Sequence, residues 1–240
     1  MLALFVADAM GLFQDNIDMA NAERHQQTIQ QQLDGPEADT WKSVTELEAN
    51  KRALQIRMEE RPGDYKRHLQ FLVYALVLGL QDVMAVRMEF FYKCAICQPE
   101  ESQQHDICLV IDMISSTLYF VFNRYKTSAH HGSYKVEVPH DLSLILRMSV
   151  SVFPRNYLFT HQKNIFVPMS DKTASQFIQN SWVLPGTGPT ATNLRSAIAT
   201  RFFRLHSAHL PRAEFAFRSG VTVDRMFQSY VKFEDGDFLT

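Results

Sequence analysis

Apolar residues recur at intervals of three and four positions along much of the chain, a spacing typical of amphipathic helices. The most apolar stretch runs from Tyr65 to Leu80 and is expected to lie at the centre of the core. A further helix is expected to begin near Gln81 and to carry Arg87 and Glu89. The other expected helices cover residues 1–33, 41–58, 140–150, 171–182, 191–203 and a segment from 215 that Gly220 interrupts and that ends at Tyr230.

Between residues 93 and 139 the apolar spacing changes from helical to alternating, which is typical of β-strands. The strands are separated by polar and turn-forming residues. We therefore predict an α+β fold that is mainly helical, with a small antiparallel sheet inserted between helices. The expected strands cover residues 93–97, 106–112, 116–123 and 133–139.

Short polar side chains mark the expected starts of several helices. Ser43, followed three residues later by Glu46, matches a capping box, in which each residue binds a free backbone N–H of the other. Asp141 and Ser170 stand at the starts of two later helices and are expected to cap them in the same way.

A polar break near residue 35 divides the chain into two parts. The run Asp34-Gly-Pro-Glu-Ala-Asp contains the residue types that end helices and form turns. We expect an N-terminal helical segment over residues 1–40 and a main domain over residues 41–240. The length of 240 residues suits this organisation, and 46% hydrophobic with 21% charged residues is ordinary for a globular protein.

The formal net charge is only −2, but the charge is unevenly distributed. Residues 1–60 hold 11 acidic against 5 basic side chains, whereas residues 192–232 hold six arginines and one lysine against two acids. A basic segment on a neutral chain indicates an anionic partner that meets one face of the protein. A solvated helix surface gives the same distribution, so charge alone leaves both interpretations open.

The three cysteines are too few, and odd in number, for a disulfide framework, which indicates a reducing, intracellular compartment. Cys94, Cys97, His105 and Cys108 have a superficial likeness to a zinc-ligand pattern. Because a strand over residues 93–97 turns Cys94 and Cys97 to opposite faces, we interpret the cysteines as core residues. No apolar run reaches the ~18 residues that a membrane span needs, so no membrane partner is expected.

Four blocks of sequence, taken in order, suggest a family. They are Val83-Met-Ala-Val-Arg-Met-Glu-Phe, the predicted hairpin from Phe120 to Pro139, the segment from Asn156 to Ser196, and Ser219-Gly-Val-Thr-Val-Asp-Arg-Met-Phe-Gln-Ser-Tyr-Val-Lys. In this order and context the chain resembles the catalytic domain of the tyrosine recombinases (phage-type integrases), particularly the divergent forms in mobile elements and large DNA viruses. The resemblance covers residues 41–232.

The resemblance implies DNA recombination or integration, in which double-stranded DNA is cut and rejoined through a covalent 3′-phosphotyrosine. It assigns Arg87 and Arg195 to a clamp on the scissile phosphate, because a guanidinium offers a fork of donors that matches phosphate geometry. Tyr230 would be the nucleophile, and Lys126 would protonate the departing 5′-oxygen. No cofactor or metal ion is implied. The implied assembly is a homo-oligomer on DNA, located in the nucleus of a eukaryote or otherwise in the cytoplasm or nucleoid.

Each assigned residue also has an ordinary structural interpretation. Arg87 precedes Glu89 and could be an exposed or ion-paired arginine, and a shift of one residue in the alignment would put Val86 in its place. Lys126 could be a solvated turn residue. Tyr230 could be a core aromatic on the apolar face of its helix.

Two positions depart from the family pattern. Thr192, three residues before Arg195, stands where the family usually has histidine, and Val221, nine residues before Tyr230, stands where it has histidine or tryptophan. Threonine can donate one hydrogen bond and valine none, so we expect weakened or lost cleavage with the fold retained. Residues 1–40 would be the remnant of a core-binding domain. The alternatives are an inactive descendant that binds DNA or a partner, and an unrelated helical interaction protein.

Overall fold

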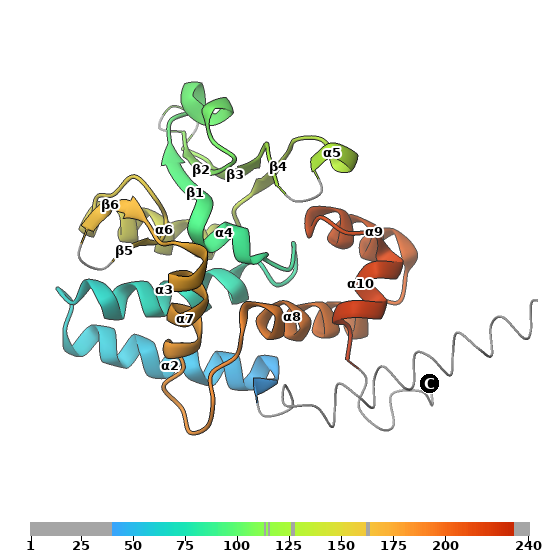
Figure 1. Cartoon of the computed structure of the whole chain (residues 1–240), viewed down its shortest axis with the longest axis horizontal. Coiled ribbons are helices and arrows are strands. Elements are labelled where there is room, and N and C mark those ends of the chain that lie inside the picture. The colour runs from blue at the N-terminus through green and yellow to red at the C-terminus, as the bar shows by residue number, and fades with distance from the viewer. Residues whose placement is uncertain (1–39, 113, 115, 126–127, 162–163, 233–240) are drawn as a thin grey trace, which may run out of the picture. The chain divides into compact units, whose positions relative to one another are not determined.

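A computed structural model gives the fold of the chain (Figure 1). Residues 40–231 form one compact unit of helices and a small sheet, which confirms the mainly helical α+β class. The predicted N-terminal segment lies outside the described residues except for Thr40, and so does Lys126. The described residues are 40–112, 114, 116–125, 128–161 and 164–232.

Most of the predicted helices begin and end close to where the apolar spacing places them, but the helix before Gly220 begins at His209 and not near residue 215, and the short helices over Pro99–Gln104 and Ser128–His131 were not predicted. They are α2 (Val44–Glu60), α3 (Tyr65–Gly79), α4 (Met88–Lys93), α5 (Ser128–His131), α6 (His140–Val152), α7 (Asp171–Asn180), α8 (Ala191–Leu205), α9 (His209–Arg218), α10 (Val223–Tyr230) and the 3-10 helix η2 (Pro99–Gln104). Ser43 and Glu46 form the predicted capping box, and Ser170 caps α7. Asp141 is not the cap of α6, because Pro139, with its ring-restricted backbone, occupies the N-cap position.

The helix predicted to begin near Gln81 is wrong. α4 begins only at Met88, and Arg87 directly before it has an extended backbone, with φ −89° and ψ 160°. A tertiary contact explains the difference, because the Ala85 N–H donates to Ser219 Oγ at 2.8 Å instead of to a preceding helical turn. The Arg87 side chain therefore projects from an extended segment and not from the surface of a helix.

The sheet is mixed, so the prediction of an antiparallel sheet is wrong for one pair of strands. β1 and β2 run parallel, with Cys94 opposite Ile107, because η2 carries the chain back to the end of the sheet where β1 began. The pairs β2–β3 and β3–β4 are antiparallel, as predicted. The strands, in spatial order, are β1 (Cys94–Cys97), β2 (Ile107–Ile111), β3 (Leu118–Phe122) and β4 (Tyr134–Glu137), and a separate hairpin pairs β5 (Thr160–His161) with β6 (Asn164–Pro168).

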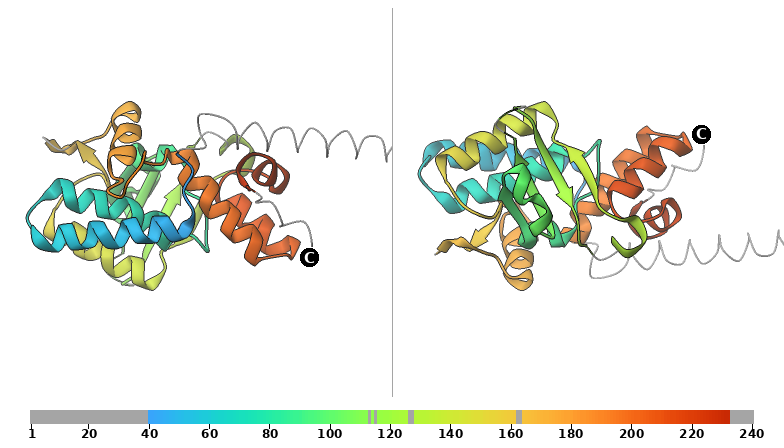
Figure 2. Two further views of the ribbon diagram at one scale, coloured as in Figure 1. Left: turned by 90° about the horizontal axis from the view of Figure 1, so that it is seen from below. Right: turned by 90° about the horizontal axis from the view of Figure 1, so that it is seen from above.

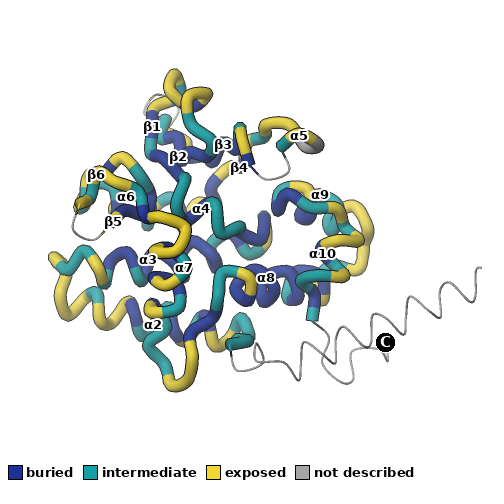
Figure 3. Tube along the Cα trace, in the orientation of Figure 1, coloured by how far each residue is buried: buried dark blue, intermediate teal, exposed yellow. Residues whose placement is uncertain are grey.

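The core lies around α3, which is buried along most of its length, as its apolar sequence predicts. Figure 2 shows the four-stranded sheet over the helical layer and α8, α9 and α10 grouped at one end of the unit. α8 is buried along most of its length beyond its first residues (Figure 3). The start of α8 is therefore positioned by a helix that is itself fixed in the core.

The cysteines are core residues, as interpreted from the sequence. Cys97 and Cys108 pack with Ala95, Val110 and Val121 in one buried cluster. Across the described ranges, no group of three or more His, Cys, Asp or Glu side chains is arranged to hold a metal ion. None of the helices in the same ranges is long and apolar enough to cross a membrane.

Candidate functional site

Three of the four predicted site residues lie around one cleft of about 530 Å³. The cleft opens between the start of α4, the start of α8, and α10 with the residues before it. Arg87, Arg195 and Tyr230 reach it from these three separate elements, with Thr192 and Val221 also in its wall. The structure therefore brings Arg87 next to two side chains that follow it by more than 100 positions in the sequence.

Arg87 is held by backbone carbonyl groups. Its Nε donates to the Ser219 carbonyl oxygen at 3.0 Å, and its Nη2 donates to the Gly220 carbonyl oxygen. The side chain is half-buried. The interpretation of Arg87 as an exposed helix residue is therefore wrong. Val86 lines the same cleft, so the alternative alignment of one residue stays open.

Arg195 lies in the second turn of α8 and is only 5% exposed. Its Nη2 donates to the Ser219 carbonyl oxygen at 2.8 Å, the same oxygen that accepts from Arg87 Nε. Its Nε is buried and has no hydrogen-bond partner among the described residues. A buried donor without an acceptor is unfavourable by about 1–3 kcal/mol. Among the residues that line the cleft, Arg195 thus has a buried donor without a partner in the described part of the chain.

Burial lowers the pKa of Arg195 to about 10, while the nearby Tyr230 phenol opposes this shift and the charge of Arg87 adds to it. The guanidinium therefore remains cationic at neutral pH, although it is partly desolvated. Its Cζ lies 4.3 Å from the centroid of the Tyr230 ring, in a cation–π contact. Two positive groups, a phenol and the carboxylate of Glu89 thus line one small cleft, and the charge of Glu89 also acts on the Arg195 guanidinium.

Tyr230 is the last residue of α10, as the sequence predicts. It is half-buried, whereas Met226 is the buried residue of this helix. Thr222 caps α10 by accepting from the Arg225 N–H at 3.3 Å, which fixes where the helix starts and hence where Tyr230 lies. The structure thus places Tyr230 at the cleft and not in the core.

The two departures from the family pattern both face the cleft. Thr192 is exposed in the first turn of α8, where free backbone N–H groups and the helix dipole favour an anion. Val221 adds only an apolar side chain. Lys126, the fourth predicted residue, falls outside the described part of the chain, so its role stays a prediction.

Sequence reasoning missed the carbonyl groups that hold the arginines. We define the 218–220 turn as Arg218, Ser219 and Gly220, which follow one another at the end of α9. The one sequence signal for this turn was Gly220. A glycine within a helical pattern indicates that the helix is interrupted, but it does not indicate that the carbonyl groups there bind arginines. Tyr92 and Arg225 also line the cleft and were not singled out.

No protein-family model matches the sequence, and a comparison with curated proteins finds no matching sequence. The case for a function therefore depends on the residues and geometry of the cleft, together with the resemblance in the order of the sequence blocks.

Proposed function

We propose that the chain binds double-stranded DNA through this cleft and cleaves and rejoins one strand through a 3′-phosphotyrosine at Tyr230. The observation that carries the proposal is the convergence of Arg87, Arg195 and Tyr230 from three separate elements. A phosphodiester between the two guanidinium groups would supply the acceptor that Arg195 Nε lacks.

In this reaction Tyr230 Oη forms a bond to phosphorus, and the bond between phosphorus and the 5′-oxygen breaks. The phenol proton is lost, and the departing 5′-oxygen takes up a proton to become a free hydroxyl. Rejoining reverses these steps and releases the phenol. The negative charge that develops on the nonbridging oxygens would be stabilised by Arg87 and Arg195, whose donors are already fixed in place.

A second candidate is a protein that binds DNA through the same cleft without cutting it. The wall of the cleft favours this alternative, because Val221 donates no hydrogen bond from its side chain and Thr192 can donate only one. Arg87 is also already engaged by the Ser219 and Gly220 carbonyl groups. Binding needs only the positive charge of the cleft, whereas cleavage also needs the proton transfers.

The test is covalent trapping with a pool of labelled duplexes of random sequence, each carrying a nick that lets the short cleaved fragment diffuse away. We expect wild-type protein to give a labelled protein band under denaturing conditions. Tyr230→Phe should bind the same duplexes but give no band. Tyr92→Phe is the matched control, because it removes another phenol from the same cleft.

The four possible outcomes are distinct. A band that is lost in Tyr230→Phe and retained in Tyr92→Phe supports the proposal. Binding without a band in wild-type protein supports the non-cutting alternative. A band that persists in Tyr230→Phe rejects the assigned nucleophile, and the absence of any duplex binding at low salt rejects both functions.

A further inference from the structure

The three carbonyl groups of the 218–220 turn accept hydrogen bonds from three side chains of distant parts of the chain. Tyr134 Oη donates to the Arg218 carbonyl oxygen at 2.7 Å. Arg87 and Arg195 donate to the Ser219 oxygen, and Arg87 also donates to the Gly220 oxygen. The last carbonyl groups of a helix lack partners within it and carry partial negative charge, so they are suited to hold cations.

Ser219 is buried, with 1% of its surface exposed, and it binds the Arg87 segment at two places. Its Oγ accepts from the Ala85 N–H at 2.8 Å, two residues before Arg87. Its carbonyl oxygen accepts from Arg87 Nε at 3.0 Å. The backbone before Arg87 and the end of the Arg87 side chain are therefore fixed to the same residue.

Gly220 is the one position of this turn where a side chain would disturb the arginine. Its φ is +72°, a region that residues with a Cβ rarely adopt. A Cβ built on Gly220 would lie 3.1 Å from both Arg87 Nε and Nη2, and 3.2 Å from Cζ. Glycine is thus needed here both for the turn and for the close approach of the guanidinium.

We infer that the 218–220 turn is the positioning element of the arginine pair and that Gly220 acts through Arg87. The carbonyl groups orient Arg87 and Arg195 toward one point before any anion arrives. Gly220 itself touches no substrate. The effect of this positioning on DNA rests on the proposed function, whereas the positioning itself does not.

The first measurement does not involve DNA. Hydrogen exchange at the Nε–H groups of Arg87 and Arg195, followed by NMR in the full chain, reports whether each guanidinium is held. We expect Gly220→Ala to speed exchange at Arg87 by about tenfold or more, since a factor of ten follows from the loss of about one hydrogen bond. Gly186→Ala is the matched control, with a φ of +91° and no atom closer to its Cβ than Lys42 Nζ at 3.8 Å.

The second measurement is a double-mutant cycle on the affinity for a random-sequence duplex. Gly220→Ala should weaken binding about tenfold in the wild-type background and less than about twofold in an Arg87→Ala background. Equal losses in both backgrounds would overturn the inference, because Gly220 would then act on the fold and not through Arg87. A matching loss in Gly186→Ala would overturn it in the same way.

The two measurements separate this inference from the proposed function. Unchanged exchange at Arg87 in a folded Gly220→Ala variant overturns the inference. Faster exchange in a protein whose wild type binds no duplex supports the positioning and rejects the proposed function. If Gly220→Ala does not fold, wild-type protein decides: an Arg87 Nε–H that exchanges as fast as that of Arg52, whose side chain is 74% exposed, would overturn the inference.

Discussion

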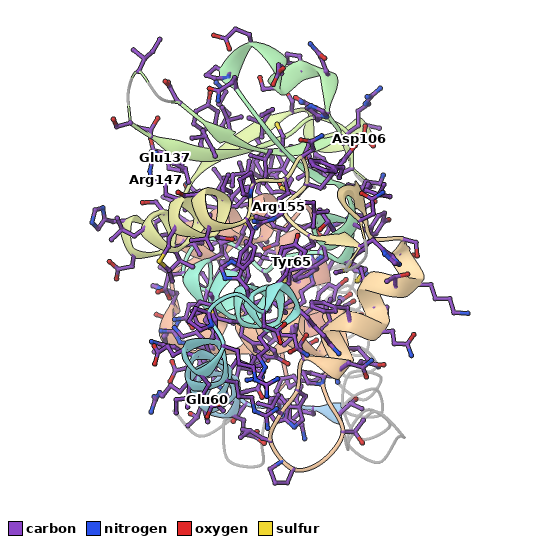
Figure 4. The ribbon with its side chains drawn as sticks, turned by 90° about the vertical axis from the view of Figure 1, so that its left-hand side faces the viewer. Glu60, Tyr65, Asp106, Glu137, Arg147 and Arg155 are labelled. Carbon is purple, nitrogen blue, oxygen red and sulfur yellow. The ribbon has the colours of Figure 1, made fainter. Side chains whose placement is uncertain are left out.

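Arg155 and Arg195 are buried to the same extent, each with 5% of its surface exposed, but their donors are used differently. Arg155 makes four hydrogen bonds: to the carbonyl oxygens of Leu158 at 3.1 Å, Ser149 at 3.0 Å and Phe153 at 2.8 Å, and to Ser149 Oγ at 2.8 Å. Figure 4 shows Arg155 in the interior of the unit, above Tyr65 of α3.

Arg195 keeps a buried donor without a partner among the described residues, beside a cleft. An arginine whose donors all bond to acceptors of the protein stabilises the fold. Removing such an arginine takes a donor away from several buried acceptors. An arginine with an open donor beside a cleft is unfavourable until a ligand arrives, which is typical of a binding site. The comparison teaches that hydrogen-bond partners, and not burial, separate the two roles.

The largest expected effect is on stability, at Arg155. Arg155→Met should lower the free energy of unfolding by about 3–4 kcal/mol, because three carbonyl groups and one hydroxyl each lose a donor in the interior, although the Ser149 oxygens keep their bonds to the Phe153 N–H and to His68. Urea unfolding measures the loss. Arg147→Met is the control, since Arg147 lies on α6 and, among the described residues, donates one hydrogen bond, to the Ser116 carbonyl oxygen at 2.8 Å. If Arg155→Met lost no more stability than Arg147→Met, the contrast between Arg155 and Arg195 would be wrong.

The opposite pattern is expected at Arg195. Arg195→Met should change the free energy of unfolding by no more than about 1 kcal/mol, because within the described part of the chain one hydrogen bond is lost, and an unpaired donor is removed with it. Formation of the trapped DNA adduct should fall by about 10²–10³, the usual effect of removing one preorganised donor. Unfolding and trapping on the same preparation test both parts. A large loss of stability with unchanged trapping would show that Arg195, like Arg155, stabilises the fold and does not act on DNA.

A pH dependence should arise from the Arg155 centre. His68 Nε2 lies 2.7 Å from Ser149 Oγ, which also accepts from Arg155 Nη2, so we expect the hydroxyl to donate to a neutral imidazole. Burial, with the charge of Arg155 second, lowers the pKa of His68 from 6.5 to about 4. Between these values the unfolded chain binds more protons than the folded chain. The free energy of unfolding should therefore be highest above pH 6.5 and fall by up to about 3 kcal/mol as the pH drops to 4.

The measurement is the urea midpoint of wild-type protein and His68→Gln between pH 4 and 7.5. The variant should lose most of the pH dependence in this range, while the arginine cleft is left intact. Parallel curves for the two proteins would show that His68 does not titrate as expected.

The smallest expected effect is at Arg225, an exposed arginine in the wall of the cleft. Arg225→Ala should reduce the slope of log affinity against log salt for a duplex by about 1, and should leave the free energy of unfolding nearly unchanged. Arg52→Ala, on the surface of α2 beside Glu48, is the control and should leave the slope unchanged. Equal slopes for Arg225→Ala and the wild type would remove Arg225 from the DNA-binding surface.

Most of the fold could be predicted because the outer helices bury one face and the central elements, such as α3, are apolar all round, and the spacing of apolar residues records both cases. The two larger errors depend on tertiary structure. The segment before Arg87 is extended and not helical because the Ala85 N–H bonds to Ser219 Oγ. β1 lies parallel to β2 because η2 returns the chain to the same end of the sheet. Arg87, Arg195 and Tyr230 were found through the family resemblance. The role of the 218–220 turn could not be predicted from the sequence, since its acceptors are backbone oxygens that every residue possesses.

The acceptors that hold Arg87 and Arg195 are neutral carbonyl groups. A carboxylate in the same place would fix a guanidinium equally well but would cancel its charge, and the field at the cleft would then be weak. A carbonyl dipole fixes the cation and leaves its net charge intact. The Glu89 carboxylate in the same wall offsets part of this charge, so the attraction of the cleft for an anion should be modest and should weaken with ionic strength.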